Sequence, residues 1–83
     1  MKVIEVYGTE WCGDCKRAKK VLDERDINYN WTDIDKDPKL MEYVKQLNNG
    51  KSIVPTIVFP DGSILVEPNN VQLIEKLELQ TLS

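Results

Sequence analysis

The first third of the chain alternates between strand-like and helix-like patterns, and this alternation leaves few possible folds. Residues 2–7 and 28–34 are typical of strands, the first ending at Gly8 and the second rich in Tyr, Trp and Thr. Residues 13–25 between them predict a helix. Its apolar stripe consists of Cys15, Ala18, Val21 and Leu22. A strand–helix–strand unit of this kind predicts a parallel pair of strands joined by a right-handed crossover.

The rest of the chain predicts a second helix, a hairpin and a last helix. Asp37 followed by Pro38 is typical of a helix start, and that helix is expected to run to about residue 47. Residues 56–59 and 64–66 predict antiparallel strands around an Asp61-Gly62 turn. Asn69 is expected to cap the last helix, with a glutamine at capping-box spacing. The side chains expected to be buried on these two helices are Leu40, Tyr43, Val44, Leu47, Val71, Ile74 and Leu77.

These elements predict an α/β domain in the order β-α-β-α-β-β-α, with a four-stranded mixed sheet and helices on both faces. At 83 residues the chain has room for one domain, residues 1–83. Its 11 basic and 14 acidic residues give a net charge of −3, which argues against a nucleic-acid partner. The absence of a long apolar run and of a signal-peptide pattern indicates a cytoplasmic protein without a membrane partner. Without histidine, the usual imidazole base is excluded.

The segment Trp11-Cys12-Gly13-Asp14-Cys15 carries the chemistry. Two cysteines at this spacing, directly after a strand and opening a helix, are typical of a dithiol–disulfide site, because both sulfurs lie on the first helical turn. Cys12 at the cap position is expected to be a thiolate, which the backbone N–H groups and the helix dipole favour. Cys15, one turn deeper, is expected to stay a thiol. Cys12 would therefore open a substrate disulfide, and Cys15 would release the mixed disulfide.

Two structural interpretations of the cysteine pair are open. Half of a zinc site would require ligands from elsewhere, because structural zinc takes four Cys or His ligands and this chain has two Cys and no His. A purely structural disulfide would close a very short loop and would stabilise the chain little.

Two neighbours of Cys12 modify this prediction. Asp14 is expected to oppose the Cys12 thiolate, which Lys16 and Arg17 favour, and we hypothesise that it makes the couple more reducing. The alternative is that Asp14 only complements the helix dipole. Trp11 is expected to belong to a contact surface rather than to the core.

A second stretch of interest is Val54-Pro55-Thr56, before the third strand. Proline in a strand-like run is disfavoured unless it begins the strand or lies at a bulge or edge. A cis Pro55 would expose the backbone of Val54 to a partner, and an ordinary trans bond is the alternative. Asn69 and Asn70 open the last helix, where they would serve as caps or help to bind the carboxylate of a small thiol.

In these features the chain resembles the glutaredoxin family of the thioredoxin-like fold over nearly its whole length, and residues 49–56, 59 and 61–63 look closest to mycoredoxin-like glutaredoxins. The resemblance implies that Cys12 is the nucleophile, that Cys15 resolves and that Pro55 is cis. It also implies that Val54 pairs with a thiol peptide and that the last helix start holds the peptide's carboxylate. The substrate-binding residues expected on these grounds are Trp11, Gly13, Asp14, Val54, Pro55, Thr56, Asn69 and Asn70.

The expected function is that of a monomeric thiol–disulfide oxidoreductase that reduces protein or mixed disulfides and binds no cofactor tightly. The expected electron donor is a low-molecular-weight thiol, either glutathione or a mycothiol-like compound, or a flavoenzyme of the thioredoxin-reductase type. One alternative is an iron–sulfur carrier, in which Cys12 from two chains and two thiol ligands bridge a [2Fe–2S] cluster. The other is a non-catalytic thioredoxin-like interaction module.

Overall fold

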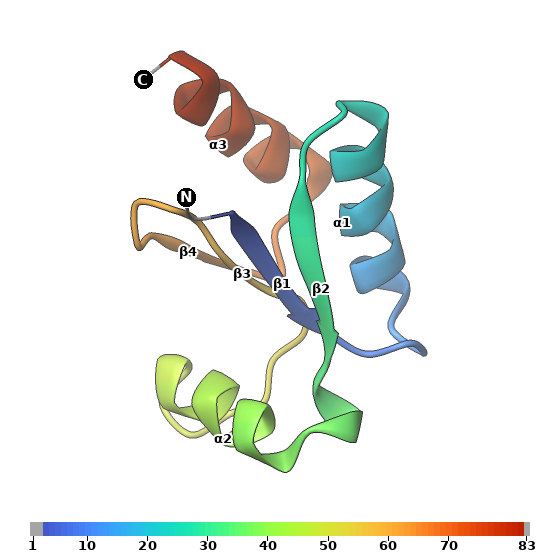
Figure 1. The fold of residues 1–83 in the computed structure, drawn as a ribbon, viewed down its shortest axis with the longest axis vertical. Helices are drawn as coiled ribbons and strands as arrows, with labels where there is room; N and C mark the ends of the chain where they lie inside the picture. The colour runs from blue at the N-terminus through green and yellow to red at the C-terminus, as the bar shows by residue number, and fades with distance from the viewer. Residues whose placement is uncertain (1–2, 83) are drawn as a thin grey trace.

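The computed structural model describes residues 3–82, which form four strands and three α-helices. In chain order the elements are β1 (Ile4–Gly8), α1 (Gly13–Glu24), β2 (Tyr29–Asp33), a 3-10 turn η1 (Ile34–Lys36), α2 (Pro38–Leu47), β3 (Thr56–Val58), β4 (Ile64–Val66) and α3 (Asn70–Leu82). Figure 1 shows their arrangement. The order of strands and helices confirms the α/β fold that the sequence predicts.

The sheet has the strand order β2-β1-β3-β4. β1 runs parallel to β2 and antiparallel to β3, and β4 returns antiparallel to β3. Val6 in the centre of β1 pairs with Trp31 on one side and with Ile57 on the other. The sheet is therefore mixed, and the parallel β1–β2 pair is joined through α1 as predicted.

Helices cover the two faces of the sheet unequally. Neighbouring residues of β1 point to opposite faces, so that Val6 lies in the core beneath α1 and α3, whereas Tyr7 lies in the core beneath α2. Among the residues whose burial the structure describes, the first core contains nine buried residues and the second contains three. In Figure 1, α2 packs near the end of β1 at which the chain leaves for α1. The larger core includes Ala18, Val21 and Leu22 and so fixes the helix that begins next to Cys12 against the sheet.

The cap of α2 and the hairpin turn form as the sequence predicts. Asp37 caps α2 by accepting hydrogen bonds from the backbone N–H groups of Lys39 and Leu40 at 3.1 and 3.3 Å. The hairpin turn closes through a bond of 2.9 Å from the Gly62 N–H to the Phe59 carbonyl oxygen. These caps and turns confirm predictions that rest on a few adjacent residues each.

The structure corrects several details. Val71 is 63% exposed, because the way α3 crosses α1 and the sheet sets which side of the helix is covered. Leu77 is buried as predicted, and Leu73 is buried in place of Val71. Tyr43 is 39% exposed and packs edge-on against Tyr7, with ring centroids 5.7 Å apart. The second strand ends earlier than predicted, because Asp33 caps the short turn η1. The predicted first strand includes Lys2, which lies outside the described residues.

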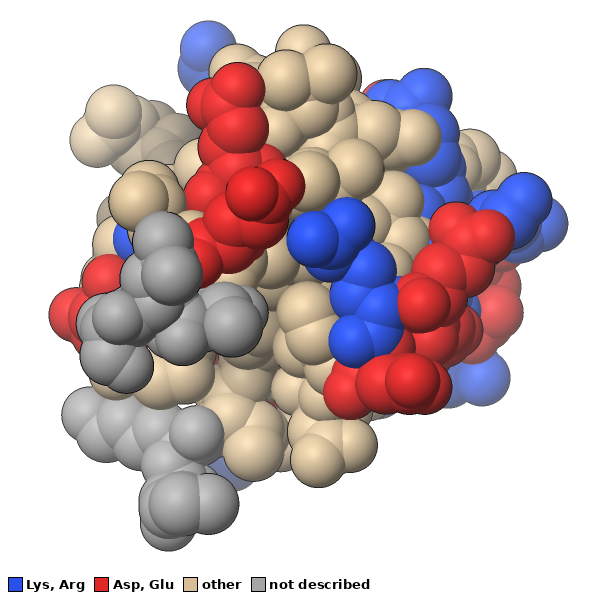
Figure 2. All heavy atoms as spheres, turned by 90° about the horizontal axis from the view of Figure 1, so that it is seen from above, with Lys and Arg blue, Asp and Glu red and all other residues tan. Residues whose placement is uncertain are grey.

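The surface carries both signs of charge. On the face shown in Figure 2, basic side chains lie beside acidic ones and do not form a continuous basic stripe. Among the helices formed by residues 3–82, none combines the length and the apolar character that crossing a membrane requires.

Candidate functional site

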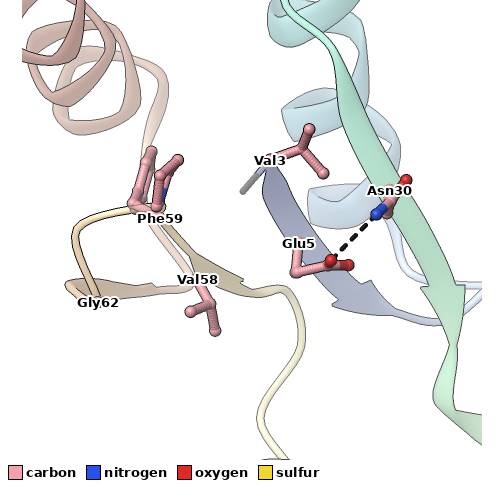
Figure 3. Close-up of a pocket in the computed structure, with 7 residues that line it drawn as sticks. Val3, Glu5, Asn30, Val58, Phe59 and Gly62 are labelled. Atoms are coloured by element: carbon pink, nitrogen blue, oxygen red, sulfur yellow. Dashed lines mark hydrogen bonds between the residues drawn. The ribbon is translucent and has the colours of Figure 1, made fainter. Parts of the chain in front are cut away.

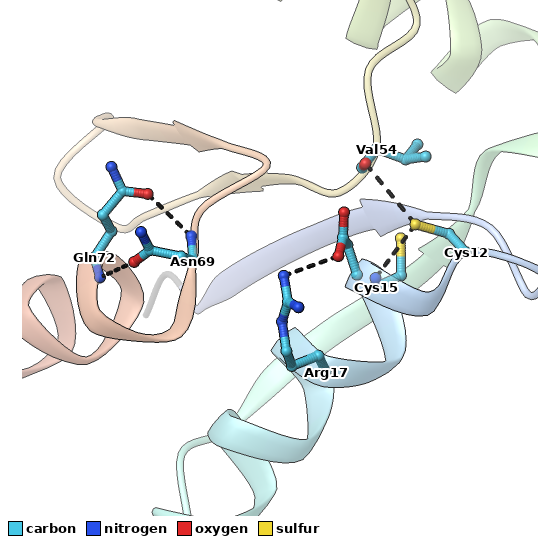
Figure 4. Close-up of polar contacts among 7 residues, drawn as sticks. Cys12, Cys15, Arg17, Val54, Asn69 and Gln72 are labelled. Carbon is cyan, nitrogen blue, oxygen red and sulfur yellow. Dashed lines mark hydrogen bonds and ion pairs between the residues drawn. The ribbon is translucent and has the colours of Figure 1, made fainter.

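The site is built around the beginning of α1, where a sulfur atom takes the place of the usual capping oxygen. Cys12 is the N-cap residue, with an extended backbone at φ −84° and ψ 117°. Its Sγ accepts a hydrogen bond from the Cys15 backbone N–H at 3.3 Å, as Figure 4 shows. The cap position puts this sulfur at the positive end of the helix, among N–H groups that have no partner in the helix. The helix start therefore favours negative charge on Cys12.

The second sulfur has a different environment. Cys15 is 0% exposed, whereas Cys12 is 8% exposed, and both are free thiols. Burial and a hydrogen bond with the Cys12 sulfur raise the pKa of Cys15 to about 12. A backbone hydrogen bond with Thr9 and the charge of Lys19 act in the opposite direction on this pKa. The two sulfurs thus differ in burial and in the groups that act on them.

A segment far along the chain lies against Cys12. The Cys12 thiol lies 3.9 Å from the carbonyl oxygen of Val54, and the Val54–Pro55 peptide bond is cis, as the resemblance implied. The Pro55 carbonyl oxygen accepts a hydrogen bond of 2.9 Å from the Glu67 N–H, which ties this segment to the residues after β4. The backbone before β3 therefore forms one wall of the cysteine site.

Thr56 belongs to the interior. Its side chain is 0% exposed, and its hydroxyl donates to the Ile53 carbonyl oxygen at 2.7 Å and accepts from the Asn48 side-chain amide at 3.0 Å. The role of this side chain is to hold the Val54–Pro55 segment in place, because none of it is exposed to a substrate.

Trp11 is the most exposed large apolar side chain beside the cysteines. It is 72% exposed, and its indole N–H donates a hydrogen bond of 2.8 Å to the Asp35 carboxylate in η1. The ring is thus held in one orientation while most of its surface faces solvent. This exposure is consistent with the contact surface expected from the sequence.

The two residues between the cysteines lie on the outside of α1. Gly13 is exposed, and a side-chain carbon added there would meet no other atom within 4 Å. Asp14 forms an ion pair of 2.8 Å with Arg17, and both side chains are about half exposed. The Asp14 carboxylate is therefore directed toward a cation on its own helix rather than toward the sulfurs.

At the start of α3, the predicted capping box is present. The Asn69 side chain accepts from the Gln72 N–H at 2.8 Å, and the Gln72 side chain accepts from the Asn69 N–H at 2.9 Å. Asn70 follows as the first helical residue and is exposed. The hydrogen bonds of Asn69 run within α3 rather than to the cysteines (Figure 4).

Three residues next to Cys15 were missed by the sequence analysis. A side-chain carbon on Gly8 would lie 2.5 Å from the Cys15 sulfur and 2.8 Å from the ring of Trp31. Lys19 lies over that same ring, with its ammonium 3.8 Å from the ring centroid. In the sequence, the only sign of this packing was Gly8, at the end of a strand just before the cysteine loop. A glycine at such a position is typical of a close approach of other atoms to the backbone.

A separate hollow of about 360 Å³ lies beside β1 and the hairpin, as Figure 3 shows. Within it, the Asn30 side-chain amide donates to the Glu5 carboxylate at 3.0 Å. Neither cysteine is among its lining residues, which are Val3, Glu5, Asn30, Val58, Phe59, Pro60 and Gly62. Over residues 3–82, no three Cys, His, Asp or Glu side chains gather closely enough to hold a metal ion.

Comparisons with known proteins find similarity to glutaredoxins in both sequence and fold. A family model described as glutaredoxin matches residues 4–64. Mycoredoxin 1 of Corynebacterium glutamicum is 36% identical over 78 residues, which cover 94% of this chain and 96% of that protein. The solved glutaredoxin of Archaeoglobus fulgidus superimposes with a TM-score of 0.78 at 27% identity, over 93% of this chain and 87% of that one. A buckwheat glutaredoxin, solved as a complex with glutathione, shares the fold with a TM-score of 0.69 at 22% identity, over 95% and 71% of the two chains.

Proposed function

The chain belongs to the glutaredoxin family and is a thiol–disulfide oxidoreductase, and on this premise we propose that Cys12 attacks and Cys15 resolves in a dithiol cycle. The observation that carries the proposal is the contrast between the sulfurs. Cys12 lies at the helix cap and accepts the Cys15 N–H at 3.3 Å, whereas Cys15 is fully buried. A thiolate attacks disulfides and a thiol does not. The iron–sulfur carrier remains an alternative without specific support from the geometry or the comparisons.

In this cycle two electrons pass from the cysteine pair to the target. The Cys12 thiolate attacks one sulfur of the target disulfide, which forms a mixed disulfide and releases the other target sulfur as a thiolate. Cys15 then loses its proton and attacks the Cys12 sulfur, which forms the Cys12–Cys15 disulfide and expels the second target thiolate. The released thiolates take up protons, including the one that Cys15 loses. A donor must then reduce the Cys12–Cys15 disulfide.

We propose that the target is a disulfide-containing protein that docks in an extended conformation over Val54. Three features beside Cys12 support this. The Val54 backbone lies next to the attacking sulfur, and the held, exposed ring of Trp11 offers an apolar anchor on the cysteine loop. Gly13, directly after Cys12, is exposed and has open space around it. One chain supplies both sulfurs, so we propose that the protein acts as a monomer, in the reducing environment of the cytoplasm.

For the donor we propose a low-molecular-weight thiol of the kind that glutaredoxin relatives use, and within that class a thiol without carboxylates, such as mycothiol. Glutathione carries two carboxylates, which a helix start would bind through free N–H groups. At α3 the capping box engages the Asn69 and Gln72 N–H groups with its own side chains, which leaves fewer N–H groups for an anion than at an uncapped helix start. The carboxylate of Glu67, just before them, adds a charge that repels an anion. The 36% identity to mycoredoxin 1 supports the same choice.

The roles of the two cysteines are tested with a trap. In Cys15→Ser the cycle should stop at the mixed disulfide, so that a disulfide-containing test protein is retained as a covalent adduct that dithiothreitol releases. Cys12→Ser should retain none. An adduct that forms through Cys15 in the Cys12→Ser variant would reverse the assignment.

The donor is tested with the oxidised protein and one reductant at a time. Mycothiol is expected to reduce the Cys12–Cys15 disulfide faster than glutathione at equal thiolate concentration. Glu67→Gln should raise the rate with glutathione more than the rate with mycothiol, because only glutathione carries a carboxylate. Faster reduction by glutathione, or reduction by a thioredoxin reductase alone, would reject the proposed donor.

A further inference from the structure

Behind the cysteine pair, α1 and the first two strands meet around Gly8. Because Gly8 has no side chain, the Cys15 sulfur and the Trp31 ring can both approach its backbone: an added carbon would lie 2.5 Å from the sulfur and 2.8 Å from the ring. The ammonium group of Lys19 lies over the same ring, 3.8 Å from the ring centroid. A cation over an indole face is an attractive contact that restricts a flexible side chain. Lys19 is thus held one helical turn beyond Cys15, on the side where the resolving sulfur is packed.

The resolving step, unlike the attacking step, requires negative charge on a buried sulfur in this region. Cys15 is completely buried, and burial is the largest cause that raises its pKa. To attack, this sulfur must carry negative charge without any contact with water. The segments packed against it contribute the uncharged Gly8 at the end of β1, the uncharged Thr9 that follows it, and the uncharged Trp31 from β2.

Two titratable side chains act on Cys15 through their charge, Cys12 and Lys19. When Cys12 is bonded to a target it carries no charge, so that its opposition to a Cys15 thiolate disappears. The Lys19 ammonium then remains as the charge that favours this thiolate. The other charged pair at the start of α1, Asp14 and Arg17, is engaged with itself on the exposed side.

We propose that Lys19, held in place by Trp31, is a positioning residue for the resolving step, whose ammonium stabilises the negative charge that develops on the Cys15 sulfur during its attack on Cys12. This inference rests on the proposed role of Cys15. In the step, the Cys15 proton passes to a released target thiolate, a bond forms between the two cysteine sulfurs, and the bond from Cys12 to the target breaks. The target sulfur leaves with the electron pair, and Lys19 keeps its proton throughout.

The test separates the two steps in one experiment. The reduced protein is mixed with excess 4,4′-dithiodipyridine, an uncharged disulfide that releases a chromophore when Cys12 attacks and again when Cys15 resolves. In Lys19→Met the second release is expected to slow roughly fivefold at pH 7, because one nearby charge is lost. The first release should keep its wild-type rate. The second rate should also approach its maximum at a higher pH than in the wild type, which a purely structural effect would not produce.

Two further variants serve as controls. Lys20→Met removes the same charge from the neighbouring, exposed position of α1, and its second release should match the wild type. Lys19→Arg keeps the charge over the ring and should restore most of the rate. The proposal is overturned if Lys19→Met leaves the second release unchanged, or if Lys20→Met slows it equally. A wild-type protein that shows no second release would instead refute the role of Cys15 itself.

Discussion

The first turns of α1 and α3 both have backbone N–H groups that need an acceptor, and different atoms serve as acceptors in the two helices. At α3, two side-chain amide oxygens accept the Gln72 and Asn69 N–H groups at 2.8 and 2.9 Å, and the cap is closed. At α1, the Cys12 sulfur accepts the Cys15 N–H at the longer distance of 3.3 Å. Sulfur is a weak acceptor when protonated, and a much better one as a thiolate. A helix start capped by oxygen is therefore mainly structural, whereas one capped by sulfur gains stabilisation when that sulfur becomes charged.

The largest expected effect comes from exchanging the sulfur cap for an oxygen cap. Cys12→Ser should reduce disulfide turnover to the uncatalysed background, because the nucleophile is gone. The same variant should keep or slightly raise its melting temperature, since serine is among the best N-cap residues. Turnover with a protein disulfide and thermal unfolding of the reduced protein measure the two results. Loss of α1 together with activity would contradict the separation of cap and nucleophile.

Alanine substitutions at two glycines test the packing behind the start of α1. Gly8→Ala should destabilise the protein by about 1–3 kcal/mol, because the new methyl group collides with the Cys15 sulfur and the Trp31 ring. Gly13→Ala is the matched control: its methyl group meets nothing within 4 Å and removes glycine from a helix, which should stabilise by up to about 1 kcal/mol. Denaturant unfolding of the reduced proteins gives both values. Equal stability of the two variants would show that Gly8 is not a close-approach position.

The closed caps should behave as ordinary structural elements. Asn69→Ala removes the side-chain oxygen that accepts the Gln72 N–H, leaves the bond from the backbone N–H of residue 69 to the Gln72 side chain, and is expected to cost about 1 kcal/mol of unfolding free energy. Asp37→Ala at the start of α2 removes two similar bonds and should cost a comparable amount. Asp37→Ala should also leave disulfide turnover unchanged, because α2 begins outside the cysteine site. A tenfold fall in its turnover would show that α2 takes part in the reaction.

The smallest effect is expected for Asp14. Because its carboxylate is half exposed and paired with Arg17, Asp14→Asn should raise the rate of Cys12 alkylation below neutral pH by less than about threefold. Arg17→Gln should change this rate in the opposite direction, since it leaves the carboxylate unpaired. Iodoacetamide rates measured against pH in a Cys15→Ser background test both. A rate in Asp14→Asn below that of the parent protein would reject the idea that Asp14 opposes the thiolate.

Most of the fold could be predicted because its signals are local. The Asp37-Pro38 start of α2, the Asn69–Gln72 box and the Asp61-Gly62 turn each depend on residues within one turn of chain. The apolar stripe of α1 was also correct, since its four residues are all buried. Predictions that depended on how helices pack were less successful. Val71 satisfies helical spacing as well as Leu73 does, and only the docking of α3 leaves Val71 exposed.

For the site, the amino-acid sequence alone determined that two sulfurs share the first turn of a helix and that one of them caps it, because three residues of separation set that geometry within any helix. The tertiary structure decided the rest. It brought the Val54 carbonyl, 42 positions away, to 3.9 Å from Cys12, and it packed Gly8, Trp31 and Lys19 behind Cys15. Residues so far apart along the chain meet only when the strands pair and the helices cover the sheet, which no local pattern encodes.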